Sequence, residues 1–108
     1  MKHLRLADVE SYDSSALGFQ GAEKWTLKLL SDSSILNELG PGGCTPAEHE
    51  HADSIERGVV LSGQGVIIHG DRRIELQPND FFEISDGNHQ YVNTGNVPLV
   101  FMCFRFPR

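Results

Sequence analysis

The chain carries, from residue 43, the segment Gly43-Cys44-Thr45-Pro46-Ala47-Glu48-His49-Glu50-His51, and Glu56 and Gly63 follow it. Alternate residues of a β-strand point to the same side of a sheet, so a strand here presents the imidazoles of His49 and His51 together. Glu56 lies an odd number of positions beyond His51, which would place it on the opposite side of an unbroken strand. A chain reversal through residues 52–55 instead puts Glu56 on the next antiparallel strand, facing both histidines. Two imidazoles and one carboxylate therefore converge.

This donor set is typical of a two-histidine, one-carboxylate metal centre. His89, which lies four residues before Asn93, is a fourth candidate ligand. Four protein ligands on a six-coordinate ion leave two positions for water, dioxygen or a chelating substrate, so the pattern predicts an open centre rather than a structural one. Nitrogen and oxygen donors suit iron, manganese, nickel, cobalt or zinc, and they do not select among these divalent metals.

The order of these residues resembles the first sequence motif of the cupin superfamily, in the form found in small single-domain bacterial cupins. A second cupin motif is partly matched by Gly87, His89 and Asn93. Asn79 stands where that motif has its first glycine, and asparagine tolerates the left-handed backbone of such a turn. Ser85 stands near the motif's proline, and the interval from Gly87 to His89 is one residue short. The resemblance covers roughly residues 35 to 105.

Turn residues recur at short intervals, and the segments between them are rich in β-branched and aromatic residues, which is typical of an all-β sandwich or barrel. The predicted strands are 25–30, 35–39, 55–61, 66–69, 73–76, 81–84, 89–92 and 99–106. The resemblance implies, more specifically, a single-domain double-stranded β-helix, the jelly-roll barrel of cupins. We expect residues 1–23 to form an N-terminal arm or edge strand and residues 24–108 to form the barrel domain.

Alternation along the strands also predicts the walls of a substrate pocket. Tyr91 follows His89 by two residues and shares its inward face, and Phe101 and Cys103 line the interior if the last strand keeps its register. Gly58 either leaves space beside the metal or marks a bend in its strand. Trp25 either caps the barrel mouth or joins the core. We expect both cysteines to be free thiols, because two are too few for a disulfide scaffold.

Composition limits the partners. A net charge of −6 argues against binding to nucleic acid, and the longest apolar run is far below the roughly 20 residues of a membrane-spanning helix. The N-terminus lacks the apolar core of a secretory signal, so a cytoplasmic protein is expected. Both faces of the last predicted strand are apolar, which favours a homodimer in which a second subunit covers the outward face.

Three function classes are compatible with these residues. The first is a metal-dependent, dioxygenase-like oxidoreductase that acts on a small molecule, in which Glu56 serves as a metal ligand or as a general base. The second is a metal-dependent isomerase or decarboxylase acting on a sugar or keto acid, which predicts more polar pocket walls. The third is a non-catalytic barrel that binds a small ligand. Within the sequence, no nucleophile elbow, phosphate-binding loop or dinucleotide fingerprint supports other chemistry.

Overall fold

A computed structural model describes residues 1–46 and 53–107 of the chain. The described residues form nine strands: β1 (Tyr12–Asp13), β2 (Trp25–Ser31), β3 (Ser34–Leu39), β4 (Ser54–Ser62), β5 (Gly65–His69), β6 (Arg72–Leu76), β7 (Phe81–Ile84), β8 (His89–Val92) and β9 (Leu99–Pro107). Three 3-10 turns precede β2, at Leu6–Asp8, Ser15–Leu17 and Ala22–Lys24. No α-helix occurs in these two ranges, so the all-β prediction is confirmed.

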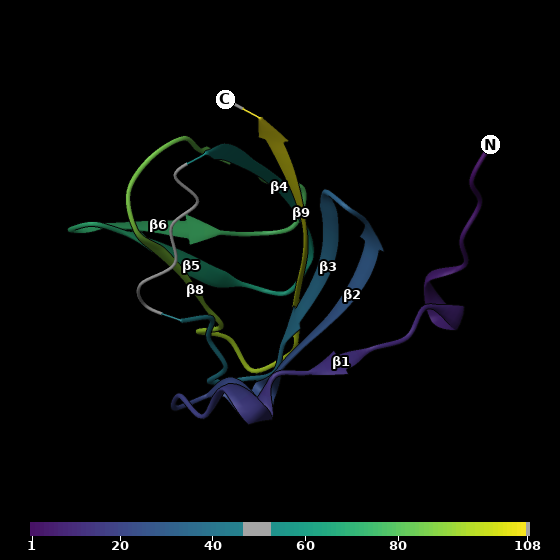
Figure 1. Cartoon of the computed structure of the whole chain (residues 1–108). Helices are drawn as coiled ribbons and strands as arrows, with labels where there is room; N and C mark the ends of the chain where they lie inside the picture. Colours follow the sequence, from purple (N-terminus) through teal and green to yellow (C-terminus); the bar gives the residue numbers. More distant parts are fainter. Residues whose placement is uncertain (47–52, 108) are drawn as a thin grey trace.

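The strands form two antiparallel sheets that face each other. The larger sheet has the order β1-β2-β3-β9-β4-β7, and the smaller has the order β6-β5-β8. Figure 1 shows the small sheet lying opposite the layer formed by β4, β9, β3 and β2. Strands distant in sequence are neighbours in both sheets, because β9 pairs with β3 and with β4. This interleaving brings β4 and β8, which carry the candidate ligands, to opposite walls of one barrel.

All eight predicted strands are present, each within one residue of its predicted ends. The structure adds β1, a two-residue strand that pairs with β2 at the edge of the large sheet. The predicted chain reversal at residues 52–55 was partly wrong. Ser54 and Ile55 already belong to β4, where they pair with Pro107 and Phe106 of β9. Glu56 nevertheless lies on the expected antiparallel strand.

The core fills the space between the two sheets. Inward residues of β9 alternate with less buried ones, and Leu99, Phe101 and Cys103 are all buried, as the period of two requires. They pack with Val60 of β4 and Tyr91 of β8 among the buried residues of a single cluster. The Phe101 and Tyr91 rings lie 4.5 Å apart between centroids, so this contact joins the large sheet to the small one.

Local turn chemistry explains how the chain crosses from β6 in the small sheet to β7 in the large one. Asn79 has φ of 73°, the only positive value at a non-glycine residue within the described ranges, and the predicted left-handed turn is confirmed. Its backbone N–H donates to the carbonyl of Val60 at 2.8 Å, while Asp80 accepts a hydrogen bond from the N–H of Gln77 at 3.0 Å. These bonds hold the turn before β7 against β4.

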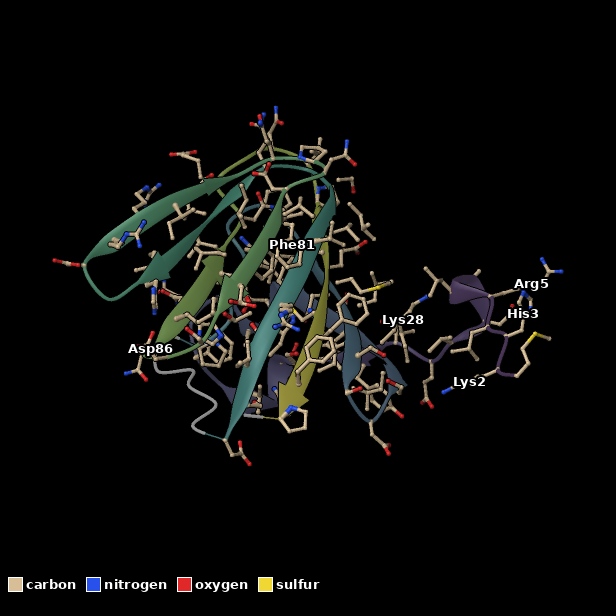
Figure 2. The ribbon with its side chains drawn as sticks, turned by 90° about the horizontal axis from the view of Figure 1, so that it is seen from above. Lys2, His3, Arg5, Lys28, Phe81 and Asp86 are labelled. Carbon is tan, nitrogen blue, oxygen red and sulfur yellow. The ribbon has the colours of Figure 1, made fainter. Side chains whose placement is uncertain are left out.

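The N-terminal arm lies away from the barrel. Figure 2 shows Lys2, His3 and Arg5 on one side of the molecule and Asp86 on the other. Two lysines join the arm to β2, because Lys28 Nζ donates to the carbonyl of Leu6 and Lys2 Nζ donates to that of Leu30, both at 2.6 Å. No helix in the described part of the chain is long and apolar enough to cross a membrane.

Gly63 allows a close approach that no other residue type permits. It lies between β4 and β5 with φ of +85°, and a Cβ placed on it would lie 2.2 Å from the carbonyl oxygen of Pro98. Gly70, in the turn between β5 and β6, also has a positive φ, of +63°, but a Cβ there would meet nothing within 4 Å. An added Cβ would strain the backbone at both glycines but would overlap a neighbouring atom only at Gly63, so comparing the two sites separates these costs.

We expect Gly63→Ala to destabilise the fold much more than Gly70→Ala. The left-handed backbone alone costs about 1 to 2 kcal/mol for alanine, whereas Gly63→Ala also forces a backbone shift costing about 1 to 3 kcal/mol more. Urea denaturation followed by circular dichroism measures both free energies of unfolding. Equal losses in the two variants would show that the contact with Pro98 is not a constraint.

Candidate metal centre and pocket

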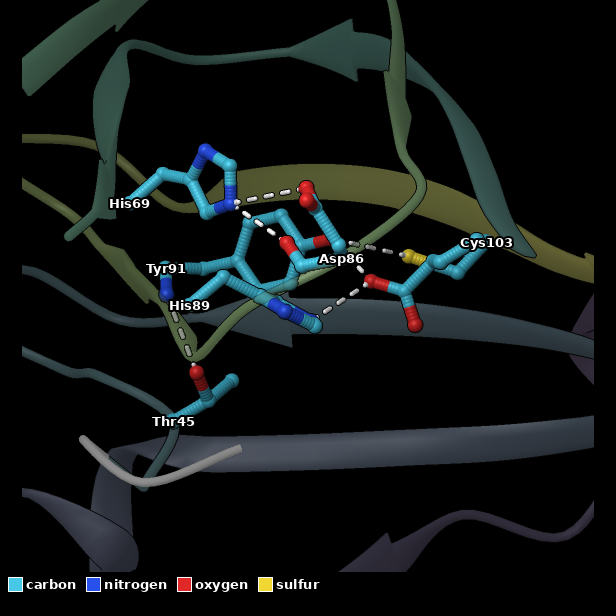
Figure 3. Close-up of polar contacts among 7 residues, drawn as sticks. Thr45, His69, Asp86, His89, Tyr91 and Cys103 are labelled. Carbon is cyan, nitrogen blue, oxygen red and sulfur yellow. Dashed lines mark hydrogen bonds and ion pairs between the residues drawn. The ribbon is translucent and has the colours of Figure 1, made fainter. Parts of the chain in front are cut away.

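Two candidate ligands, Glu56 and His89, meet inside the barrel. Glu56 lies on β4 and is 3% exposed, and His89 opens β8 and is 2% exposed. The Nε2 atom of His89 lies 3.1 Å from Oε2 of Glu56. A dashed line from His89 marks this contact in Figure 3. A carboxylate and an imidazole buried this deeply must satisfy each other or a bound group, because leaving either unsatisfied would be costly.

His69, a neighbouring histidine on β5, bonds to the backbone of a loop and not to Glu56. His89 pairs with His69 of β5, and Tyr91 pairs with Ile67. His69 uses its Nε2 atom to donate to the backbone carbonyl of Asp86 at 2.5 Å, and Figure 3 shows its ring turned toward Asp86. This bond holds the loop before β8 against β5.

Tyr91 completes the buried polar cluster. Its hydroxyl donates a hydrogen bond to Oε2 of Glu56, and the Cys103 thiol donates to the Tyr91 oxygen at 3.8 Å. Burial raises the pKa of the Tyr91 hydroxyl well above its ordinary value, and the adjacent Cys103 and Glu56 raise it further. Burial likewise raises the pKa of the Cys103 thiol. Both groups therefore keep their protons at neutral pH and act as donors.

Thr45, which sequence reasoning did not single out, anchors the start of the histidine segment. Its N–H donates to the carbonyl of Tyr91, and its hydroxyl accepts from the N–H of Tyr91, both at 3.0 Å. Gln90 adds a bond from its side-chain amide to the Thr45 carbonyl at 2.9 Å. The chain is therefore held against β8 four residues before His49. His49 and His51 themselves lie outside the described residues.

Asn93 fixes the loop that follows β8. Its side-chain amide donates to the carbonyls of Leu39 and Val97, both at 2.8 Å, and its oxygen accepts from the N–H of Gly95 at 2.8 Å. The residue is 2% exposed, so its amide is fully used within the protein. At this position of the second cupin motif, the asparagine therefore holds the loop after β8 through its side-chain amide.

A cavity of about 240 Å³ opens next to the Glu56 cluster. Its described walls are mostly apolar and comprise Trp25, Leu27, Leu29, Ile35, Asn37, Thr45, Glu56, Tyr91, Cys103 and Arg105. Trp25 thereby belongs to the pocket wall, and its indole N–H donates to Oδ1 of Asn37 at 3.1 Å. Neither Asn37 nor Arg105 was identified from the sequence, because alternation gives the face on which each residue lies but not which strands enclose the cavity.

Two predicted pocket residues occupy other places. Phe101 is fully buried behind Tyr91 and is not among the described walls of the cavity. Gly58 does not open space beside Glu56, because the ring of Phe82 fills it: a Cβ on Gly58 would lie 2.2 Å from Cζ of that ring. Gly58 therefore accommodates an aromatic ring of β7. Tyr91 and Cys103 do line the cavity, and both cysteines are free.

The described residues supply part of the expected ligand set. Within residues 1–46 and 53–107, no cluster of three or more His, Cys, Asp and Glu side chains could hold a metal ion. Glu56 and His89 account for two of the four predicted ligands. Their imidazole nitrogen and carboxylate oxygen are donor types that a transition metal would bind.

A sequence model of the cupin domain matches residues 35–105. Among curated proteins, an uncharacterized protein of Methanocaldococcus jannaschii is 29% identical over 75 residues, which are 68% of this chain. The match covers 60% of that relative, so the chain spans less than two thirds of its length.

Two solved structures are similar over nearly the whole chain. The predicted oxalate decarboxylase of Thermotoga maritima has a TM-score of 0.82 at 22% identity, covering 99% of this chain and 100% of that one. The polyketide cyclase RemF of Streptomyces resistomycificus has a TM-score of 0.75 at 26% identity, covering 97% and 78%. Together with the domain match, these structures confirm the predicted jelly-roll fold.

Proposed function

The chain belongs to the cupin family, since the cupin-domain model matches most of its length, and on that premise we propose that it is a metal-dependent oxidoreductase. The proposed reaction is dioxygenase-like, and the substrate is a small, largely apolar molecule. The observation that carries the proposal is the buried Glu56–His89 pair, whose Glu56 lines an apolar cavity.

Burial of this pair is hard to explain by stability alone. Removing a carboxylate from water costs several kcal/mol, and apolar replacement of buried ion pairs is often neutral or stabilising. Apolar cavities with a few converging polar groups are typical of binding sites. We therefore assign Glu56 and His89 to a metal centre whose other ligands are His49 and His51. The metal is divalent iron, manganese, nickel, cobalt or zinc.

The residues of the chain have distinct roles in this proposal. A bound metal would supply Lewis-acid or redox chemistry and open positions for substrate and dioxygen. Tyr91 holds its proton toward Glu56 and fixes which carboxylate oxygen stays engaged. That bond leaves Glu56 able to serve as a ligand or, when the substrate carries an acidic proton, as a general base.

The pocket walls favour an oxidoreductase over the isomerase or decarboxylase alternative. Leucine, isoleucine and aromatic side chains dominate the described lining, whereas a sugar would need several polar partners. The similar structures bear names of different activities, a decarboxylase and a cyclase, so the fold alone selects no reaction. A non-catalytic small-ligand-binding cupin is the remaining alternative.

Metal exchange should separate these reaction classes. The proposed enzyme consumes dioxygen with its substrate when loaded with iron, and we expect zinc to abolish that uptake because zinc has no redox cycle. An oxygen electrode with a panel of small aromatic and aliphatic substrates measures this. Equal turnover with zinc and iron would favour an isomerase or decarboxylase, and tight binding of a ligand recovered unchanged without metal would favour a binding protein.

We expect His89→Ala to weaken metal binding at least about a hundredfold, because even residues outside the ligand shell contribute 10- to 100-fold. Glu56→Gln should weaken it less, since the amide keeps one oxygen. His3→Ala is the matched control, because His3 lies on the arm at the far side of the molecule from Asp86 (Figure 2). Calorimetric titration of folded, metal-free protein gives each affinity. Unchanged binding in His89→Ala would contradict the assignment.

The outer face of the large sheet supports the proposed homodimer. Outward side chains of β4, β7 and β9 are mostly apolar, and Leu61, Phe81 and Phe106 are 45%, 68% and 42% exposed. Arg57 lies 4.7 Å over the Phe106 ring and pairs with Glu83 at 2.6 Å. A second copy of this face would cover the apolar side chains. We retain a cytoplasmic location, with neither nucleic acid nor membrane as a partner, as part of the proposal.

Light scattering at micromolar concentration should give the mass of two chains. Phe81→Ser should shift the protein toward monomer, because it removes the most exposed of these rings from the face. Leu17→Ser is the control, since Leu17 is 62% exposed but lies on a 3-10 turn outside the large sheet. A monomeric parent, or equal effects of both substitutions, would contradict a dimer through this face.

A further inference from the structure

Arg105 places a positive charge on the wall of the cavity. It is the inward residue that follows Cys103 on β9, and it pairs in register with Glu56 of β4. Its side chain lines the cavity and is exposed. In the part of the chain that the structure describes, its guanidinium forms no ion pair and donates no hydrogen bond. Five donors in a planar fork are therefore available at this wall.

Asn37 supplies a second donor from a different strand. It is 5% exposed, and its amide oxygen is taken by the indole N–H of Trp25 at 3.1 Å. Because that bond fixes the oxygen, the amide nitrogen is the group left to the cavity. Among the described residues, this nitrogen has no hydrogen-bond partner. A ligand oxygen in the cavity can therefore accept a hydrogen bond from this nitrogen.

Apolar surface separates these two donors. Asn37 of β3 lies opposite Phe101 of β9, and Arg105 lies four residues further along β9. The backbones of Asn37 and Arg105 are therefore roughly 13 Å apart along the strand direction. Between them, the wall is formed by Ile35 and by its partner on β2, Leu29. A ligand reaching both donors must therefore carry an apolar body between its polar groups.

The charge of the cavity walls and the volume of the cavity restrict the class of ligand further. One guanidinium balances one negative charge, and its fork matches the two oxygens of a carboxylate. A phosphate dianion would lack a second cation in the described walls and would lie near the Glu56 carboxylate. With about 30 Å³ for each water in the liquid, the cavity of about 240 Å³ holds a molecule of roughly ten non-hydrogen atoms.

We propose that the cavity binds a small monocarboxylate with an apolar body, with the carboxylate on Arg105 and an acceptor oxygen on Asn37. The body then lies against Trp25 and Tyr91, beside Glu56. This inference rests on the proposed function, because it names the substrate class of the same site, but the binding contacts involve no predicted metal ligand.

The test uses phenylacetate and its neutral isostere phenylacetamide. Trp25 is the only tryptophan in the chain and lines the cavity, so its fluorescence reports occupancy, and calorimetry provides a second readout. In metal-free protein we expect phenylacetate to bind about tenfold more tightly than phenylacetamide, the effect of one charge-assisted hydrogen bond. Arg105→Gln should remove this preference, and Arg105→Lys should keep part of it.

Arg73→Gln is the matched control, because Arg73 lies on β6 and is exposed away from the cavity. It should retain the full preference for phenylacetate. Asn37→Ala should weaken binding of 4-hydroxyphenylacetate, whose phenol oxygen can accept from the Asn37 amide, more than binding of phenylacetate, which has no second acceptor. A parent that binds neither probe or treats them alike, or an Arg105→Gln variant that still prefers phenylacetate, would overturn the inference.

Repeating the titration with metal-loaded protein keeps the two proposals apart. Metal binding without a carboxylate preference would overturn this inference and leave the metal centre standing. A carboxylate preference that depends on Arg105 in a protein that binds no metal would support the inference and reject the metal-dependent reaction.

Discussion

The contact of Glu56 with His89 and Tyr91 is the constraint on which the rest of the structure depends. A buried carboxylate is stable only with donors placed on it, and here one comes from the hydroxyl of Tyr91 while the imidazole of His89 lies 3.1 Å away. The donors are on the small sheet and the acceptor is on the large one. The two sheets must therefore keep a fixed separation and register. The ring contact between Phe101 and Tyr91 and the hydrogen bonds between Thr45 and Tyr91 maintain both.

Much of the fold could be predicted because its signals are local. Turn residues mark the ends of strands, and β-branched and aromatic runs mark the strands themselves, so all eight predicted strands are present. The alternation along β8 and β9 also placed His89, Tyr91 and Cys103 inside the barrel. Asn79 adopts its predicted left-handed backbone because the short polar side chain of asparagine tolerates that conformation.

What the sequence did not reveal depends on pairing between distant strands. Arg105 and Asn37 reach the cavity only because β9 lies between β3 and β4, and no local pattern states that order. For the same reason Gly58 accommodates the Phe82 ring of a neighbouring strand, and Phe101 is covered by Tyr91. Thr45 is short and polar, and its role depends on contact with a strand 46 residues away.

Elemental analysis of untagged protein, purified without added metal, tests the central claim most directly. We expect close to one iron or manganese ion per chain in the parent and none in a folded His49→Ala, His51→Ala double variant. The Glu56–His89 pair would then be half of a metal centre. A well-folded parent that stays empty after reconstitution with each divalent metal would contradict this account and leave a ligand-binding barrel in its place.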